Sequence, residues 1–138
     1  MIHSYGGMIV IMILAGLSSS MYLWADKLTD VRLSVNDAYM ILLMTAWMCL
    51  FMAISNRDWA TVTMSAAAVA ALLIGIRGQL FVPLSQFYTG MIPHHSMAVH
   101  MSRRLLVNDP TLSPADREFV ASIIKTQERE IEWMKQRS

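Results

Sequence analysis

The chain has 138 residues, of which 55% are hydrophobic and only 15% are charged. This composition is more apolar than that of an ordinary soluble domain, and it indicates a membrane protein in contact with lipid. The net charge of +1 provides no concentrated basic face, so the sequence argues against a nucleic-acid partner. The single cysteine, Cys49, excludes an intramolecular disulfide and a CxxC metal or redox motif.

Three apolar segments in the first half of the chain predict membrane-spanning helices. Residues 5–24 contain no charge, and their length is sufficient to cross a hydrocarbon core of about 30 Å. Two further apolar segments, 38–54 and 60–76, are joined by a short polar link and are expected to form an antiparallel pair. Residues 1–4 lack the basic start of a secretory signal peptide, so we expect the first span to be retained. We therefore assign residues 1–77 to a three-helix transmembrane region.

Methionines recur every four residues along the second predicted span, at Met40, Met44, Met48 and Met52. This spacing places them on one stripe of a helix. A stripe of thioethers could relay Cu(I) through a membrane, but methionine is also an adaptable packing residue, and the chain holds 13 of them. We favour packing as the interpretation of this stripe.

After Arg77 charged residues become frequent, and the pattern changes to that of amphipathic helices in water. Two prolines, Pro83 and Pro93, interrupt this part of the chain. Because proline lacks the amide donor of a helix interior, residues 78–92 are expected to be a connector, either a loop or a kinked helix. Residues 93–138 are expected to form a separate helical hairpin.

Signals for helix ends divide this hairpin into two helices. The first is expected to run from about Pro93 to Val107, since Asp109 precedes a proline and is biased away from helical geometry. Ser113 is a good N-cap for the second helix, which is expected to end near Gln136. The loop between the helices is short, so they should be antiparallel neighbours.

The first helix of the hairpin carries three of the four histidines of the chain, interleaved with methionines. Imidazole and thioether share one chemistry, which is the coordination of a soft, low-charge metal ion such as Cu(I) or Ag(I). Taken singly, each would more often be a packing or solvated residue, but their conjunction weakens that interpretation. The candidate metal ligands are Met91 just before this helix, His94, His95, Met97, His100 and Met101 on it, and Met134 on the next helix.

Helical geometry suggests how these ligands are arranged. Counting from the loop places His94 level with Gln127 on the second helix. His94, Met97 and Met101 are expected on one narrow arc that faces the second helix. His95 points about 100° away from His94, so it would need another helix or another subunit.

Two polar residues of the second helix, Gln127 and Glu130, are expected to support the site. The carboxylate of Glu130 can accept a proton from an imidazole and orient the ring. The competing interpretation is that His94 is a buried structural histidine bonded to Gln127 or Glu130. The remaining charges of this helix are expected to form a solvated face.

A combined motif across both helices resembles the signature of the ferritin-like family catalogued as domain of unknown function 305. The motif consists of Met91-Ile92-Pro93-His94-His95, Ala98, Met101, an Asp-Pro turn, Ile123-Ile124, Gln127, Glu130-Ile131 and Met134. The resemblance implies a bacterial copper-binding protein with a four-helix bundle, working outside the cytoplasm in copper storage or resistance. The three apolar segments also resemble a membrane-bound branch of that family with one two-helix unit. Where relatives often carry an acidic residue, this chain has Pro83 and Leu84.

The sequence therefore predicts an all-α protein with three transmembrane helices followed by an antiparallel two-helix unit, half of a ferritin-like bundle. A second Pro-His-His motif is absent from the sequence. The bundle would be completed either by an extension of the membrane helices or by a homodimer with an isologous contact, and we favour the homodimer.

The predicted function is non-enzymatic binding of Cu(I) or Ag(I) for copper storage, tolerance or handover. The alternative is a helical membrane adaptor whose C-terminal hairpin binds a protein partner without metal. A di-iron enzyme would need a Glu-x-x-His motif, which the sequence lacks. The expected location is the bacterial inner membrane, with several crossings. Basic residues near the helix ends would place the hairpin inside the cell, whereas the resemblance implies the periplasm, which we expect.

Overall fold

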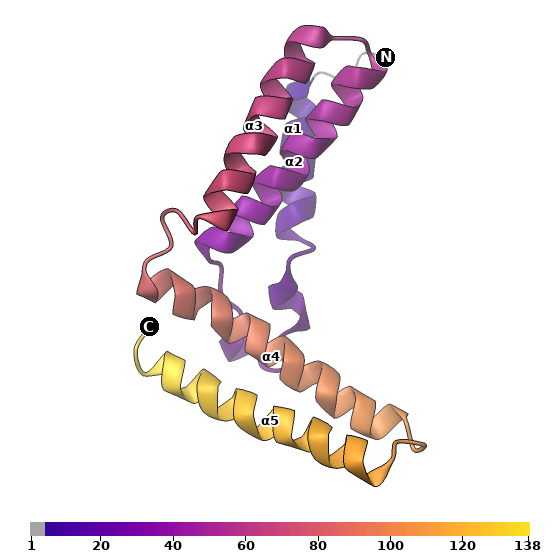
Figure 1. Cartoon of the computed structure of the whole chain (residues 1–138), viewed down its shortest axis with the longest axis vertical. Helices are drawn as coiled ribbons and strands as arrows, with labels where there is room; N and C mark the ends of the chain where they lie inside the picture. Colours follow the sequence, from indigo (N-terminus) through magenta and orange to yellow (C-terminus); the bar gives the residue numbers. More distant parts are fainter. Residues whose placement is uncertain (1–4) are drawn as a thin grey trace. The chain divides into compact units, whose positions relative to one another are not determined.

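The computed structural model describes residues 5–138, which contain helices and no strand. The helices are α1 Tyr5–Leu17, α2 Val35–Ser55, α3 Trp59–Arg77, α4 Leu84–Asn108 and α5 Pro114–Lys135 (Figure 1). Two short 3₁₀ helices, η1 Met21–Trp24 and η2 Leu28–Asp30, lie between α1 and α2. The predicted all-α class is confirmed for this part of the chain. The signal-peptide prediction depends on residues 1–4, which lie outside the described residues.

The chain folds into two units. The described part of the first unit covers residues 5–20 and 35–82 and holds α1, α2 and α3. The second unit covers residues 21–34 and 83–138 and holds η1, η2, α4 and α5. The sequence analysis assigned residues 21–34 to the transmembrane region, whereas the structure packs them with the C-terminal hairpin. This difference has a specific cause in the polar contacts described below.

Within the described residues, three segments are long and apolar enough to cross a membrane: Tyr5–Trp24, Val35–Ser55 and Trp59–Arg77. They agree with the three spans predicted from the sequence. The first segment is one continuous α-helix only as far as Leu17. Serine hydroxyls at its end donate to backbone carbonyls, from Ser18 Oγ to Leu14 and from Ser20 Oγ to Gly16. Such local bonds offer the backbone an alternative to regular helix.

Close helix packing within the first unit depends on glycine. A Cβ atom on Gly16 of α1 would lie 3.0 Å from the side chain of Ile41 on α2. A Cβ atom on Gly75 of α3 would lie 3.0 Å from the Tyr39 ring, also on α2. Small residues at such points let neighbouring helix backbones approach one another, as is common between membrane helices.

The methionine stripe of α2 lies largely on the outside of this unit. Met40, Met44 and Met48 are exposed, whereas the residues of α2 that pack inside include Ile41 and Thr45. In a membrane, this position would bring the three thioethers into contact with lipid. They are therefore not the residues that pack α2 against its neighbours within the unit.

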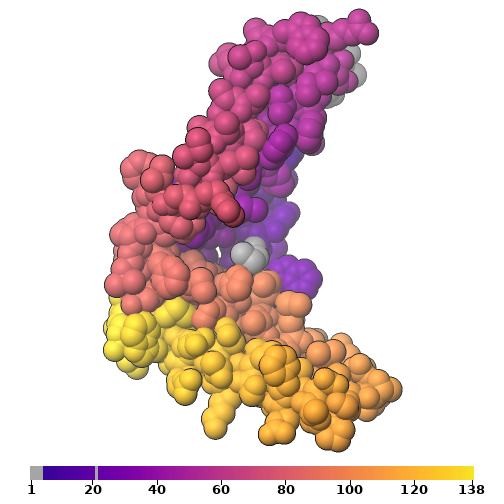
Figure 2. Space-filling model, viewed as in Figure 1, coloured from indigo at the N-terminus to yellow at the C-terminus, as the bar shows by residue number. Residues whose placement is uncertain are grey.

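In the second unit, α4 and α5 lie side by side along the hairpin (Figure 2). The helix ends at the connecting loop agree with the sequence prediction. Helix α4 ends at Asn108, and at the start of α5 Ser113 Oγ accepts a hydrogen bond from the Asp116 amide. The outer end of α4 differs, because the helix already begins at Leu84 and continues through Pro93. Residues 78–92 were expected to be either a loop or a kinked helix, and from Leu84 onward they are helical.

Burial explains why α4 tolerates a proline in its interior. A proline inside a helix costs about 3 kcal/mol, because a hydrogen bond is lost and the ring crowds the preceding turn. On either side of Pro93, however, Tyr88, Ile92 and Val99 form a core with Ile131 and Met134 of α5. Burying a large apolar side chain stabilises by about 1.5–3 kcal/mol, so several together offset the cost.

Candidate functional site

The face that α4 turns toward α5 is not the one predicted. His94 and Met101 are exposed to solvent, whereas Ile92 and Val99 are buried against α5. The predicted arc of His94, Met97 and Met101 facing α5 is therefore wrong. Because the branched side chains of Ile92 and Val99 gain more from burial, they determine the rotation of the helix. That rotation also turns His95, rather than His94, toward α5.

His95 makes its contact within the hairpin and does not need another subunit to find a partner. Its Nδ1 atom lies 3.2 Å from Oε2 of Glu130 on α5. Glu130 thus lies beside an imidazole, as expected, and the ring is that of His95. The Nδ1 atom is buried, and despite the short distance the alignment does not produce a hydrogen bond. A buried polar nitrogen left without a bond is unusual and costly, so it marks a candidate site.

The protonation state of His95 suits a metal ligand. Burial lowers the pKa of the ring below its usual value; the Glu130 carboxylate opposes this effect, and the neighbouring His94 reinforces it. The imidazole is therefore neutral at neutral pH. A neutral imidazole can offer the lone pair of one ring nitrogen to a metal ion.

His95 opens into a pocket of about 290 Å³ between α4 and α5. The pocket is lined by Phe87, Tyr88, Met91, His95, Glu130, Trp133 and Met134. Three of the predicted ligands thus line the same pocket: Met91 and His95 from α4, and Met134 from α5. Two thioethers and one imidazole form a donor set that prefers soft, monovalent ions.

Aromatic rings form much of the pocket wall, and the sequence analysis did not assign them to the site. The Tyr88 and Trp133 rings meet edge to face, with centroids 5.5 Å apart. The Arg137 guanidinium lies 4.0 Å from the centroid of the Trp133 ring, in a cation–π contact. These contacts fix the indole beside the thioethers. Two sequence features could have identified these rings as part of the site: Trp133 is adjacent to Met134, and Tyr88 lies one helical turn before Ile92.

The remaining predicted site residues do not line this pocket. His94 is exposed, and Met97 and Gln127 are half-buried elsewhere on the hairpin. His100 lies near a different partner, with Nδ1 3.9 Å from Oδ1 of Asp26. Within residues 5–138, no group of three or more His, Cys, Asp or Glu side chains is arranged to hold a metal ion. The candidate site therefore depends on thioether sulfur.

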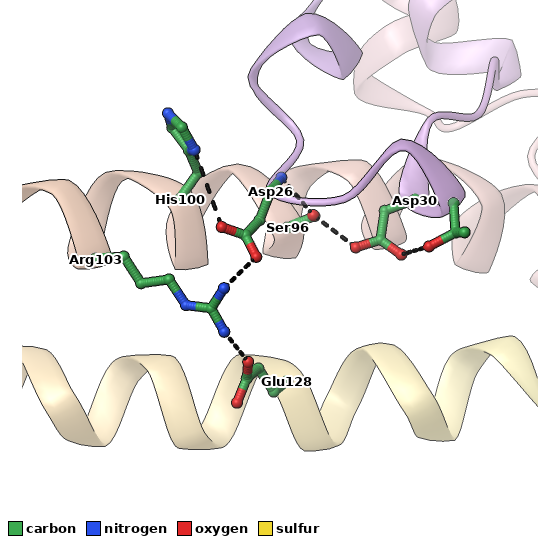
Figure 3. A network of polar contacts seen from close by, with 7 residues as sticks. Asp26, Asp30, Ser96, His100, Arg103 and Glu128 are labelled. Carbon is green, nitrogen blue, oxygen red and sulfur yellow. Dashed lines mark hydrogen bonds and ion pairs between the residues drawn. The ribbon is translucent and has the colours of Figure 1, made fainter.

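A separate polar network joins residues 21–34 to the hairpin (Figure 3). Its centre is Asp30, which is only 2% exposed. Ser96 Oγ of α4 donates to Asp30 Oδ2 at 2.7 Å, and Lys135 Nζ of α5 lies 2.6 Å from Asp30 Oδ1. Ser96 Oγ also accepts a hydrogen bond from the Asp26 amide at 2.9 Å. We call Asp30, Ser96 and Lys135 the Asp30 clamp.

A second ion-pair chain runs beside this clamp. The guanidinium of Arg103 on α4 contacts Asp26 Oδ2 at 2.6 Å and also contacts Glu128 on α5 (Figure 3). One arginine thus bridges residues 21–34 and both helices. The sequence did not predict this network, because it joins charges that are far apart in the chain and show no recognisable spacing.

Comparisons with known proteins agree with the motif of the hairpin. The family model described as Domain of unknown function (DUF305) matches residues 55–137. An uncharacterised protein of Acanthamoeba polyphaga mimivirus is 36% identical over 132 residues, covering 92% of this chain and 86% of the viral protein. No solved structure matches the chain. The relative is viral, so a location in the bacterial inner membrane stays an expectation. Neither the family description nor the name of the relative mentions copper. With more than half of its length matched, the chain belongs to the DUF305 family.

Proposed function

We propose that this protein is a membrane-anchored, non-enzymatic binder of Cu(I) or Ag(I), with Met91, His95 and Met134 as the ligands. The observation that carries the proposal is the buried Nδ1 atom of His95, which has no hydrogen bond and lies in a pocket with two thioethers. An ion bound to the other ring nitrogen would fix the proton on Nδ1, and the Glu130 carboxylate, 3.2 Å away, could then accept it in a hydrogen bond. Storage, tolerance or handover of copper at a membrane would follow from such a site.

The chemistry of the pocket favours a soft ion over zinc. Zn(II) sites are usually built from four ligands, drawn from thiolate, imidazole and carboxylate groups. This pocket offers one imidazole and one carboxylate, that of Glu130, together with two neutral thioethers. Methionine sulfur selects Cu(I) among the common biological metals. The surrounding aromatic rings would limit access of water to the ion.

Glu130 would support the site by orienting the imidazole of His95, which is the metal ligand. Its carboxylate already lies within 3.2 Å of His95 Nδ1. A small movement of either side chain would let the carboxylate accept a proton from the ring and leave the other nitrogen for the ion. Such partners of metal ligands typically change metal affinity by about 10–100-fold when removed.

The test is competition for Cu(I) between the detergent-purified full chain and a colorimetric Cu(I) chelator under anaerobic, reducing conditions. His95→Ala and Met134→Leu should each weaken the affinity by more than about 10-fold, since each removes a ligand. His94→Ala and His100→Ala are matched controls outside the pocket and should bind as the wild type does.

Two outcomes would defeat the proposal. One is Zn(II) binding that is tighter than Cu(I) binding at the same pH. The other is unchanged copper affinity in His95→Ala and Met134→Leu alike, with helix content retained. The first result would indicate a zinc-binding protein, and the second would favour the membrane adaptor, which binds a protein partner without metal.

A further inference from the structure

One broad face of the hairpin carries a regular row of apolar side chains along α4. Its members alternate at spacings of three and four residues: Leu84, Phe87, Met91, Ala98, Met101 and Leu105, with His94 in step between Met91 and Ala98. Such a 3.5-residue repeat is the spacing of seams in coiled coils and helix bundles. It is also the arc that the sequence analysis expected to face α5.

A second row with the same spacing runs along α5, with three apolar and two polar members. Its members are Phe119, Ile123, Thr126, Glu130 and Trp133, again at alternating spacings of four and three. The two rows lie on the same side of the hairpin, because Phe87 and Met91 of the first and Trp133 of the second line one pocket. We call the two rows together the heptad face.

The heptad face lies opposite the surface covered by residues 21–34. Residues two apart in an α-helix point about 200° away from each other. Met101 and Trp133 belong to the heptad face, whereas Arg103 and Lys135, each two residues further along, contact residues 21–34. One side of the hairpin is thus covered within the chain. The other side carries the exposed apolar side chains described next.

The heptad face exposes much apolar surface for a protein domain in water. Leu84, Phe87, Met101, Leu105, Phe119 and Trp133 are each between 42% and 65% exposed. With about 200 Å² on each large side chain, they leave on the order of 600 Å² of surface open. A standard interface buries about 800 Å² per partner, so this face and its half-buried members approach the area that a stable dimer needs.

We propose that the heptad face binds the heptad face of a second copy of this chain, so that two hairpins form a four-helix bundle. Two seams side by side on an antiparallel hairpin are half of such a bundle. A twofold contact uses the same patch on both copies, so it needs no further partner. The residues that flank the α5 row, Glu118, Lys125 and Arg129, carry both signs of charge. A lipid surface would favour a basic border instead.

The bundle would also close the pocket of His95. Trp133 and Glu130 belong to the heptad face and to the pocket wall, so a second hairpin would cover the pocket opening. The proposal itself does not depend on copper, because it is argued from spacing and exposure. Its test is therefore made with a Cu(I) chelator present, so that its failure is separate from failure of the copper site.

The experiment measures the protein mass of the detergent-solubilised full chain by size exclusion with light scattering. The wild type should have twice the mass of one chain. Met101→Glu and Phe119→Glu, on different helices of the heptad face, should each have the mass of one chain. Val107→Glu is the matched control, because Val107 is 74% exposed on α4 but lies outside the row, and it should stay at twice the mass.

Circular dichroism must show equal helix content in every variant. If Met101→Glu loses helix, Met101→Gln, which adds no charge, takes its place. A wild type with the mass of one chain would overturn the proposal. So would folded variants of the heptad face that keep twice the mass, since another surface would then hold the copies together.

Discussion

Replacing Asp30 with asparagine should release residues 21–34 from the hairpin. The substitution keeps the shape of the side chain and removes its charge, leaving Lys135 Nζ without the carboxylate that lies 2.6 Å away. Removing one partner of a fully buried ion pair costs about 3–5 kcal/mol. The side chain of Lys135 keeps 21% of its surface exposed and can turn to water, so we expect about 2–3 kcal/mol.

Hydrogen–deuterium exchange of the full chain in detergent measures the loss of stability directly in residues 21–34. The Asp26 amide donates to Ser96 Oγ, so it should be protected as long as the clamp holds. A loss of about 2–3 kcal/mol corresponds to roughly 30–150-fold faster exchange in peptides covering residues 21–34. Exchange in α2 and α3 should not change.

Glu132→Gln is the matched control, because Glu132 pairs with the same lysine at 3.6 Å but is largely exposed. Exposed pairs contribute at most about 1 kcal/mol. If Asp30→Asn exchanged at the wild-type rate, or if Glu132→Gln had an equal effect, the buried clamp would not hold this segment.

The clamp also predicts a dependence on pH. Burial raises the pKa of Asp30, but the hydrogen bonds from Lys135 and Ser96 and the charge of Lys135 outweigh it and hold the pKa below its usual value. A carboxyl group with a lowered pKa stabilises the folded state above its unfolded pKa of about 3.9. This contribution is lost as the pH falls through the folded pKa. Protection of residues 21–34 should thus be constant from neutral pH to about 4 and fall below it, and Asp30→Asn should lack this fall.

Three further predictions concern the hairpin and its side of the membrane. Ser113→Ala should cost about 1 kcal/mol in thermal unfolding, since Ser113 Oγ accepts from the Asp116 amide at 3.1 Å. Met134→Leu should cost less than about 1.5 kcal/mol in the same assay, because volume is conserved, while copper affinity falls. Ser138→Cys with Cys49→Ala should react with an impermeant maleimide in intact spheroplasts; labelling only after lysis would place the hairpin inside the cell.

Local signals were sufficient to predict the end of α4, the start of α5 and the register between the two helices. Ser113 and Asp109 act through their nearest neighbours, so their effect is readable from the sequence. Counting outward from Val107 and Pro114 places Tyr88 level with Trp133, and these two rings are in contact. The predicted register of the hairpin is therefore confirmed at this pair.

The rotation of α4 about its axis was not predictable in the same way. Two neighbouring arcs of this helix carry apolar residues, one through Ile92 and Val99 and the other through His94 and Met101. Helical periodicity accepts either arc as the buried face. The choice depends on which set fits against Ile131 and Met134 of α5, and that fit is a property of the packed structure.

The position of residues 21–34 depends on contacts that no local pattern reveals. Asp30 pairs with Lys135, close to the other end of the chain. The contact is nevertheless consistent with the predicted spans. Residues 21–34 precede α2 and α4 follows α3, so they lie on the same side of a membrane if α2 and α3 each cross it once. The Asp30 clamp therefore agrees with a membrane-spanning pair formed by α2 and α3.

The clamp and the heptad face together would determine how far the proposed assembly of hairpins can proceed. A hairpin of two amphipathic helices has two broad sides, and an uncovered apolar side invites further association. Residues 21–34 occupy one side through Asp30, Ser96 and Arg103. On the hairpin, the proposed dimer would then use the heptad face, and a twofold contact between identical faces closes on itself. In the proposed dimer, the same intramolecular contact that holds the connection between α1 and α2 would limit the association of hairpins to two chains and would leave the His95 pocket on the shared face.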